Sequence, residues 1–227
     1  MIFKLYFNIK IFDMMAVQLG ENSWILIGIM LLEILFIVLP ALIYGRVKKQ
    51  SFIDEIKDMG FQKNDDLLIK VISGLGFGIL FFFFSNYIII FFRDLIVRNL
   101  FGAEFIEIAQ EGAISTAPIQ PNFLQLIIVI VLQIIIIGPC EEAFFRGFLI
   151  KKFNMKLKSI YSSLISSTFF TLYHVPPFLV PIPTIVTFFG YYFTFGLLLS
   201  FIFVYFNYSL IPCSVAHSCF NILLMVI

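Results

Sequence analysis

Six long apolar stretches dominate this chain and restrict its fold more than any other feature. They cover residues 24–44, 67–92, 123–153, 159–174, 184–206 and 209–227. A membrane-spanning helix needs about 20 apolar residues, and lipid offers no partner for unpaired backbone groups. Only 13% of the residues are charged and 61% are hydrophobic, whereas soluble domains carry about 25% charge. We therefore predict an all-α fold, a polytopic membrane helical bundle of about six transmembrane helices.

The sequence divides into two parts near residue 122. Residues 1–122 are predicted to hold an N-terminal interfacial segment, two transmembrane helices and an acidic loop, and residues 123–227 a second membrane domain. The first segment, residues 1–17, mixes Lys4, Lys10 and Asp13 with apolar residues and lacks the pattern of a cleaved signal peptide. It is typical of an amphipathic helix at the membrane surface.

The connections between the apolar stretches differ in charge. Residues 46–66 and 151–158 are rich in lysine and arginine, whereas residues 93–122 are mostly acidic. Because cytoplasmic loops carry the excess of basic residues, we expect the two basic connections in the cytoplasm and both termini outside. The Ile-, Phe-, Lys- and Asn-rich composition suggests an AT-rich prokaryotic genome, so we predict an integral, multi-pass protein of a prokaryotic plasma membrane. The net charge of +1 does not point to nucleic acid as a partner.

Three ionisable residues lie close together inside the third apolar stretch: Glu141, Glu142 and Arg146. Charges at bilayer depth are costly and usually functional. Glu142 and Arg146 are four residues apart, so on a helix they share a face and can neutralise each other. Glu141 lies about 100° round the helix and lacks such a partner, which leaves it free for chemistry. The alternative is a charge cluster at the membrane boundary, with the lysine pair at 151–152 only ten residues away.

The only two histidines lie in other apolar stretches. His174 ends the fourth stretch, and His217 lies inside the sixth with Asn221 one helical turn beyond it. Singly, each histidine is explained by packing or by hydrogen bonds between helices. Together with Glu141 they offer complementary chemistry on three helices: a carboxylate and an imidazole can take a proton from water, and a second imidazole and a carboxamide can stabilise an oxyanion.

These residues resemble, in order, three motifs of a known family. Glu141-Glu142-x-x-x-Arg146, Phe170-x-x-x-His174 and His217-x-x-x-Asn221 are similar to those of the CAAX-protease and bacteriocin-processing family (Abi, CPBP), which includes the Ras-converting (prenyl-protein) endopeptidases. The resemblance covers about residues 123–227, and the N-terminal half matches only loosely. It implies that this second part is the CAAX-protease/Abi-like catalytic membrane domain, with the catalytic core in the last four helices.

The resemblance implies an intramembrane endopeptidase of the glutamate type, a class often labelled metalloprotease. Glu141 and His174 would activate the attacking water, and His217 and Asn221 would stabilise the oxyanion. By the same resemblance, three further residues would hold the helix and shape the site: Glu142, Arg146 and Phe170.

The sequence leaves the cofactor and the substrate open. We expect no cofactor; the alternative is zinc, with Glu141, His174 and His217 as ligands. The expected partners are the lipid bilayer and a peptide or membrane-protein substrate, such as a CAAX-type tail or a bacteriocin or signal peptide. A non-catalytic Abi-family immunity or regulatory membrane protein is the alternative function, and a small transporter with a proton relay is a third.

Overall fold

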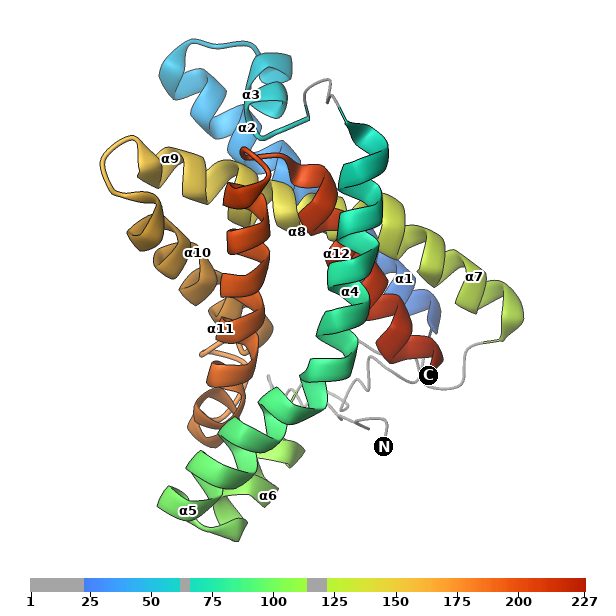
Figure 1. Ribbon diagram of the computed structural model, residues 1–227, viewed down its shortest axis with the longest axis vertical. Helices are drawn as coiled ribbons and strands as arrows, with labels where there is room; N and C mark the ends of the chain where they lie inside the picture. Colours follow the sequence, from blue (N-terminus) through green and yellow to red (C-terminus); the bar gives the residue numbers. More distant parts are fainter. Residues whose placement is uncertain (1–22, 62–65, 114–121) are drawn as a thin grey trace, which may run out of the picture.

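The computed structural model describes residues 23–61, 66–113 and 122–227, and no β-strand occurs in these residues. The N-terminal segment predicted to lie at the membrane surface falls outside them. The helices, with η marking π-helical stretches, are α1 (Ser23–Leu32), α2 (Leu35–Lys48), α3 (Phe52–Asp58), α4 (Leu67–Ile89), η1 (Ile90–Val97), α5 (Arg98–Phe101), α6 (Ala103–Glu111), α7 (Phe123–Leu132), η2 (Gln133–Ile137), α8 (Gly138–Glu142), η3 (Ala143–Ile150), α9 (Lys151–Asn154), α10 (Ser159–His174), α11 (Ile182–Tyr205) and α12 (Leu210–Val226) (Figure 1). The predicted all-α fold is confirmed.

Four helical stretches are long and apolar enough to cross a membrane. They are Ile27–Lys48, Leu67–Phe101, Phe123–Asn154 and Ile182–Tyr205. The remaining two of the six predicted stretches form shorter helices, α10 with 16 residues and α12 with 17. The acidic connection after the second stretch begins inside a helix, because η1 and α5 continue α4 to Phe101 and α6 follows.

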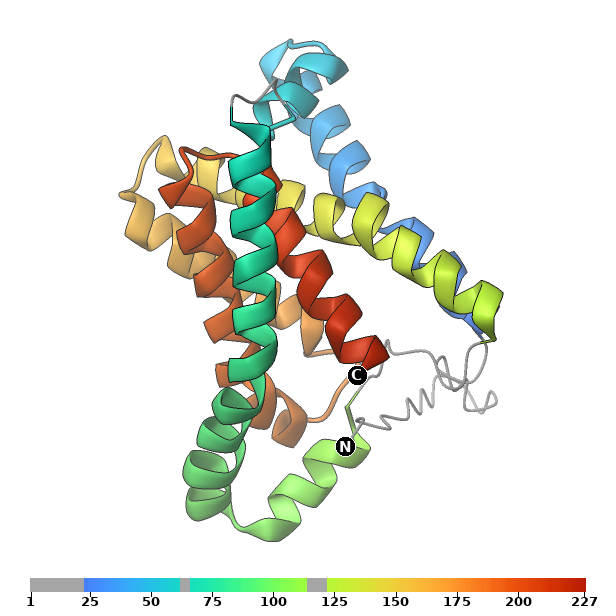
Figure 2. The ribbon, with the colours of Figure 1, turned by 45° about the vertical axis from the view of Figure 1, so that its right-hand side comes forward.

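The third apolar stretch forms one long continuous helix, from α7 to α9, that runs obliquely beside α1 and α2 (Figure 2). Its hydrogen-bonding pattern changes twice, to π-helix at η2 and again at η3. Pro139 follows η2 and has no N–H, and its ring crowds the carbonyl of Ile135, four residues earlier. Widened turns relieve such crowding and are frequent at functional sites. The five residues of α8, which include both glutamates, thus lie between two widened segments.

Helices α4 and α12 pack in close contact along their length. A β-carbon added to Gly74 would lie 2.7 Å from the carbonyl oxygen of Pro212, and one added to Gly78 would lie 2.6 Å from Cβ of Cys219. The Gly-x-x-x-Gly spacing therefore serves close helix packing, as is common in membranes. This contact holds α12 against the centre of the bundle.

The two basic connections lie at one end of the bundle, and α5 and α6 lie at the other (Figure 1). Lys152, at the end of the long helix, forms a 3.0 Å ion pair with the buried Glu55 of α3. The neighbouring Lys151 donates to the carbonyl oxygen of Asp58 at 2.7 Å. These contacts place both basic connections at the same end, as the predicted alternation of the helices requires.

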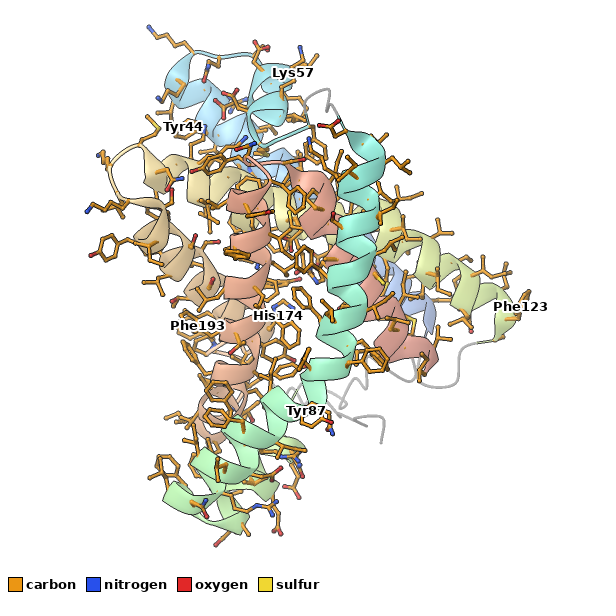
Figure 3. The ribbon with its side chains drawn as sticks, in the orientation of Figure 1. Tyr44, Lys57, Tyr87, Phe123, His174 and Phe193 are labelled. Atoms are coloured by element: carbon orange, nitrogen blue, oxygen red, sulfur yellow. The ribbon has the colours of Figure 1, made fainter. Side chains whose placement is uncertain are left out.

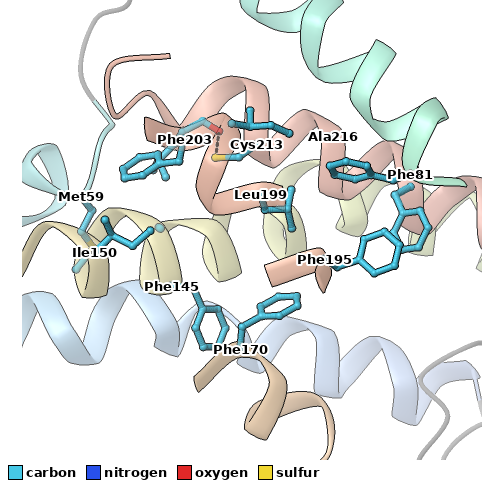
Figure 4. Close-up of a cluster of buried hydrophobic side chains, with 14 of the residues drawn as sticks. Met59, Phe81, Phe145, Ile150, Phe170, Phe195, Leu199, Phe203, Cys213 and Ala216 are labelled. Atoms are coloured by element: carbon cyan, nitrogen blue, oxygen red, sulfur yellow. Dashed lines mark hydrogen bonds between the residues drawn. The ribbon is translucent and has the colours of Figure 1, made fainter. Parts of the chain in front are cut away.

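A cluster of buried apolar side chains joins the long helix to α10, α11 and α12 (Figure 4). Phe145 and Phe170 meet edge to face, with ring centroids 5.3 Å apart. Phe195 of α11 contacts Phe81 of α4 on the far side of the cluster, at 5.6 Å. The polar residues of the site are set into this packed apolar region, so their positions depend on it.

Candidate active site

Glu142 and Arg146 form a completely buried ion pair. Both side chains are 0% exposed, and Arg146 Nη1 donates to Glu142 Oε1 at 2.9 Å. The second terminal nitrogen of Arg146 donates to the carbonyl oxygen of Gly196 on α11 at 3.1 Å. The guanidinium group also lies over the ring of Phe170, 4.5 Å from its centroid. The pair predicted from the four-residue spacing is therefore present, and it ties the long helix to α10 and α11.

Glu142 also contacts His217 of α12. The Nδ1 atom of His217 lies 2.8 Å from Glu142 Oε1. Two acceptors at that distance would repel each other, so Nδ1 carries the hydrogen and donates it to the carboxylate. In the neutral imidazole, Nε2 then carries a lone pair. One oxygen of Glu142 thus accepts from both Arg146 and His217, and this orients the imidazole.

His174 is oriented by its own helix. Its Nδ1 atom lies 2.9 Å from the carbonyl oxygen of Phe170, one turn earlier. A carbonyl oxygen only accepts, so Nδ1 again carries the hydrogen and Nε2 the lone pair. The rings of Phe170 and His174 pack with centroids 4.3 Å apart, and Tyr192 of α11 covers His174 at 4.7 Å. Phe170 therefore packs against His174, one turn further along the same helix.

Glu141 lies between the two imidazoles. Its Oε2 atom is 4.0 Å from Nε2 of His174 and 4.0 Å from Nε2 of His217. The residue is 4% exposed, and Oε2 has no hydrogen-bond partner among the described residues. When both imidazoles are neutral, three groups that can each accept a hydrogen bond therefore face one another in an apolar environment. This arrangement favours a small molecule that donates hydrogen bonds to more than one of them.

The two histidines that approach Glu141 occupy different positions along their helices. His174 ends α10, whereas Glu141 lies near the middle of the long helix and His217 near the middle of α12. The oblique course of the long helix brings these positions together (Figure 2). Figure 3 shows His174 well inside the bundle, far from Lys57 at the end that carries α3.

Asn221 lies one turn beyond His217 on α12, with its partner on the long helix. Its Nδ2 atom donates to Oε1 of Gln133 at 3.1 Å. Helical spacing puts Asn221 on the same face of α12 as His217. The structure therefore joins Glu141, His174 and His217 at one point and holds Asn221 beside them through Gln133.

Two residues next to the site were not expected to interact. The hydroxyl of Tyr173, the neighbour of His174, donates to Oε1 of Glu33, which lies at the break between α1 and α2. Both side chains line a groove of about 620 Å³ whose other walls are apolar residues of α1, α2 and η3. Only the polarity of Glu33 within an apolar stretch signalled this contact, and the sequence does not reveal its partner. The carbonyl of Gly196, which binds Arg146, has no sequence signal.

The geometry around Glu141 does not fit a zinc ion. Two ligand atoms that are each about 2.0–2.1 Å from a tetrahedral zinc lie roughly 3.3 Å apart, less than the 4.0 Å between Glu141 Oε2 and either histidine Nε2. Within the ranges that the structure describes, no group of three His, Cys, Asp or Glu side chains is arranged to hold a metal ion.

A comparison with family models gives one match. Residues 123–223 match the family described as Rce1-like, type II CAAX prenyl endopeptidase. No significant match was found among curated proteins or among solved structures. The resemblance to the CAAX-protease family is thereby confirmed for the part of the chain that contains the site. Together with the long apolar helices, the match supports an integral membrane protein whose residues 123–223 are similar to a peptidase family.

Proposed function

We propose that this protein is a multi-pass intramembrane endopeptidase in which Glu141 and His174 activate water for attack on a peptide bond. The observation that carries the proposal is the convergence of Glu141 Oε2 with the Nε2 atoms of both histidines at 4.0 Å. If a water oxygen lies about 2.8 Å from both atoms, the angle between the two acceptors at that oxygen is roughly 90°. Both O–H···acceptor angles can then stay above about 150°, as hydrogen bonds prefer. One water can therefore donate to Glu141 and to an imidazole together.

The proposed reaction assigns each proton. The water oxygen forms a bond to the carbonyl carbon of the substrate while one of its protons passes to Glu141, assisted by His174. In the proposed reaction His217 starts with a second proton, bound to Nε2, and keeps it throughout. The carbonyl oxygen becomes an oxyanion, which accepts hydrogen bonds from this N–H and from Asn221. When the C–N bond breaks, the proton held by Glu141 passes to the leaving amine. One peptide bond is hydrolysed, and Glu141 returns to its starting state.

Glu142 supports the role assigned to His217. To donate through Nε2 as well as Nδ1, the imidazole must be protonated. A buried carboxylate 2.8 Å from Nδ1 stabilises that cation. Arg146 forms an ion pair with the same carboxylate, so Glu142 joins the guanidinium group and the imidazole. The proposed site operates without a metal ion, in accord with its donor geometry.

The substrate we propose is a membrane-associated peptide with an apolar segment, as in a CAAX-type tail or a bacteriocin or signal peptide. Tyr173 lines the groove beside α1 and α2, and its ring contacts His174 edge to face, with centroids 5.2 Å apart. An apolar part of the substrate in this groove would lie next to the reacting bond. We propose a prokaryotic plasma membrane as the location, on the basis of the residue composition.

The test is cleavage of a reporter peptide by the purified, full-length protein. We expect Glu141→Gln and His174→Ala each to lower kcat by about 10²–10⁴-fold, the usual contribution of a general base. The matched control is Glu104→Gln, an exposed glutamate on α6, which should cleave like the wild type. Full activity of both site variants would overturn the proposed mechanism. Absence of cleavage by the wild type for every membrane peptide tested would favour a binding or regulatory protein.

A chelator tests separately whether cleavage requires a metal ion. We expect a chelator to leave cleavage by the wild type unchanged, because Glu141 and the histidines are too far apart to share a tetrahedral ion. Loss of activity on chelation, with recovery on adding zinc, would contradict the metal-free mechanism and support the zinc alternative.

A further inference from the structure

Gln133 is a buried polar residue whose acceptors both bind α12. It begins η2 and is 6% exposed. Its carbonyl oxygen accepts from the hydroxyl of Ser218 at 2.7 Å. Its side-chain Oε1 accepts from Nδ2 of Asn221 at 3.1 Å. Two consecutive turns of α12 are therefore held by one residue of the long helix, eight positions before Glu141.

The backbone around Gln133 permits this approach. A β-carbon added to Gly138 would lie 2.1 Å from Oγ of Ser218 and 2.9 Å from the carbonyl oxygen of Ser214. Only a residue without a side chain lets α12 come this close. The π-helical turn also directs the N–H of Gly138, rather than that of Ile137, to the carbonyl of Gln133. That oxygen has a second lone pair, which Ser218 uses.

The contact with Oε1 determines how the Asn221 carboxamide is turned. A carboxamide has two N–H donors and one carbonyl acceptor. Because Oε1 of Gln133 only accepts, the NH₂ end of Asn221 faces the long helix and one of its hydrogens is used there. The other hydrogen stays on the same nitrogen, next to the helix that carries Glu141. Without this acceptor, the carboxamide could rotate and present its oxygen instead.

We propose that Gln133 is a positioning residue for the peptidase reaction, which holds the Asn221 carboxamide so that its free N–H faces the oxyanion. The proposal rests on the function assigned to Asn221 above. Gln133 itself does not touch the substrate. Its effect should appear in transition-state stabilisation and hence in kcat, because the hydrogen bond to the oxyanion forms only as the tetrahedral intermediate develops.

The test replaces Gln133 by methionine, which has a similar length and no amide acceptor. We expect Gln133→Met to lower kcat by about tenfold or more, below the 10²–10³-fold cost of removing an oxyanion donor outright, while KM stays within about twofold. If Gln133 only stabilised helix packing, its substitution would lower stability and the folded fraction but leave kcat per folded molecule unchanged. Circular dichroism and size-exclusion chromatography in detergent measure the folded fraction.

Two further variants make the result decisive. Gln133→Met combined with Asn221→Ala should be no slower than Asn221→Ala alone, because Gln133 acts through Asn221. The matched control is Gln125→Met on α7, where the lost contact is the capping-box bond from the N–H of Asn122; it should keep the wild-type kcat. Independent, multiplicative losses, or an unchanged kcat in Gln133→Met, would overturn the proposal. If Glu141→Gln is fully active as well, the proposed function itself fails.

Discussion

The two glutamates at the centre of the long helix have opposite surroundings, although they are neighbours in the chain. Glu142 accepts hydrogen bonds from Arg146, one turn further along its own helix, and from His217 of α12. Glu141 faces the tips of two imidazoles at 4.0 Å, and its Oε2 has no partner among the described residues. The Oε2 atom of Glu142 also lacks a partner within the described ranges, so the difference lies in Oε1 of Glu142, which has two donors. Removing one partner of a buried ion pair is costly, whereas a buried carboxylate without such a partner lowers stability and is kept where it serves function. The comparison distinguishes a carboxylate in an ion pair from the one that we propose as the base.

The comparison predicts a ranked series of effects on the free energy of unfolding. The largest should come from Arg146→Met, because it leaves the buried Glu142 without its cation. Breaking one partner of a buried ion pair costs about 3–5 kcal/mol. Denaturation in detergent, followed by circular dichroism, measures the loss. The variant Glu142→Leu/Arg146→Met should recover much of it, since the buried charge is then gone; no recovery would mean that the pair does not act as a unit.

A smaller loss of unfolding free energy is expected from Gly138→Ala, on the side of the long helix that contacts α12. The added methyl group would lie 2.1 Å from Oγ of Ser218, and overpacking of this kind costs about 1–3 kcal/mol. Gly76→Ala is the matched control, because nothing lies within 4 Å of a β-carbon there. Equal effects of the two substitutions on the melting temperature would show that α12 does not pack as tightly as described.

Tyr173→Phe should lower the free energy of unfolding by a still smaller amount. It removes the hydroxyl that donates to Glu33, but Tyr173 is 40% exposed, so a loss of about 1 kcal/mol is expected. Because the ring remains against His174, peptide cleavage should stay within a few-fold of the wild type. A drop in kcat as large as that of His174→Ala would instead assign the hydroxyl to the reaction.

The smallest change in stability, with the opposite sign, should come from Glu141→Gln. Removing a buried charge that has no ion-pair partner should leave the unfolding free energy unchanged or raise it by about 1 kcal/mol, while cleavage is lost. Thermal unfolding and reporter cleavage of the same preparation give both quantities. A loss of stability comparable to that of Arg146→Met would remove the distinction between the two glutamates.

Much of this arrangement could be predicted from local patterns. The six apolar stretches are all helical, and the Glu142–Arg146 pair and the close packing at Gly74 and Gly78 follow from residue spacing. These features depend on helical periodicity, which is local. The links from Tyr173 to Glu33 and from Arg146 to the Gly196 carbonyl could not be predicted. They join helices far apart in the sequence, and a backbone carbonyl has no side-chain signal.

Local spacing in the sequence was enough to predict the apolar helices and the partner of Glu142 one turn away. It also identified the candidate residues of the active site. Only the tertiary structure decided that Glu141 meets both histidines, that His217 binds Glu142 and that Gln133 turns Asn221. The reason is physical: spacing along one helix fixes which residues share its face, whereas distances between helices depend on tilt, widened π-turns and the side chains that fill the bundle. The role of Glu141 depends on those distances.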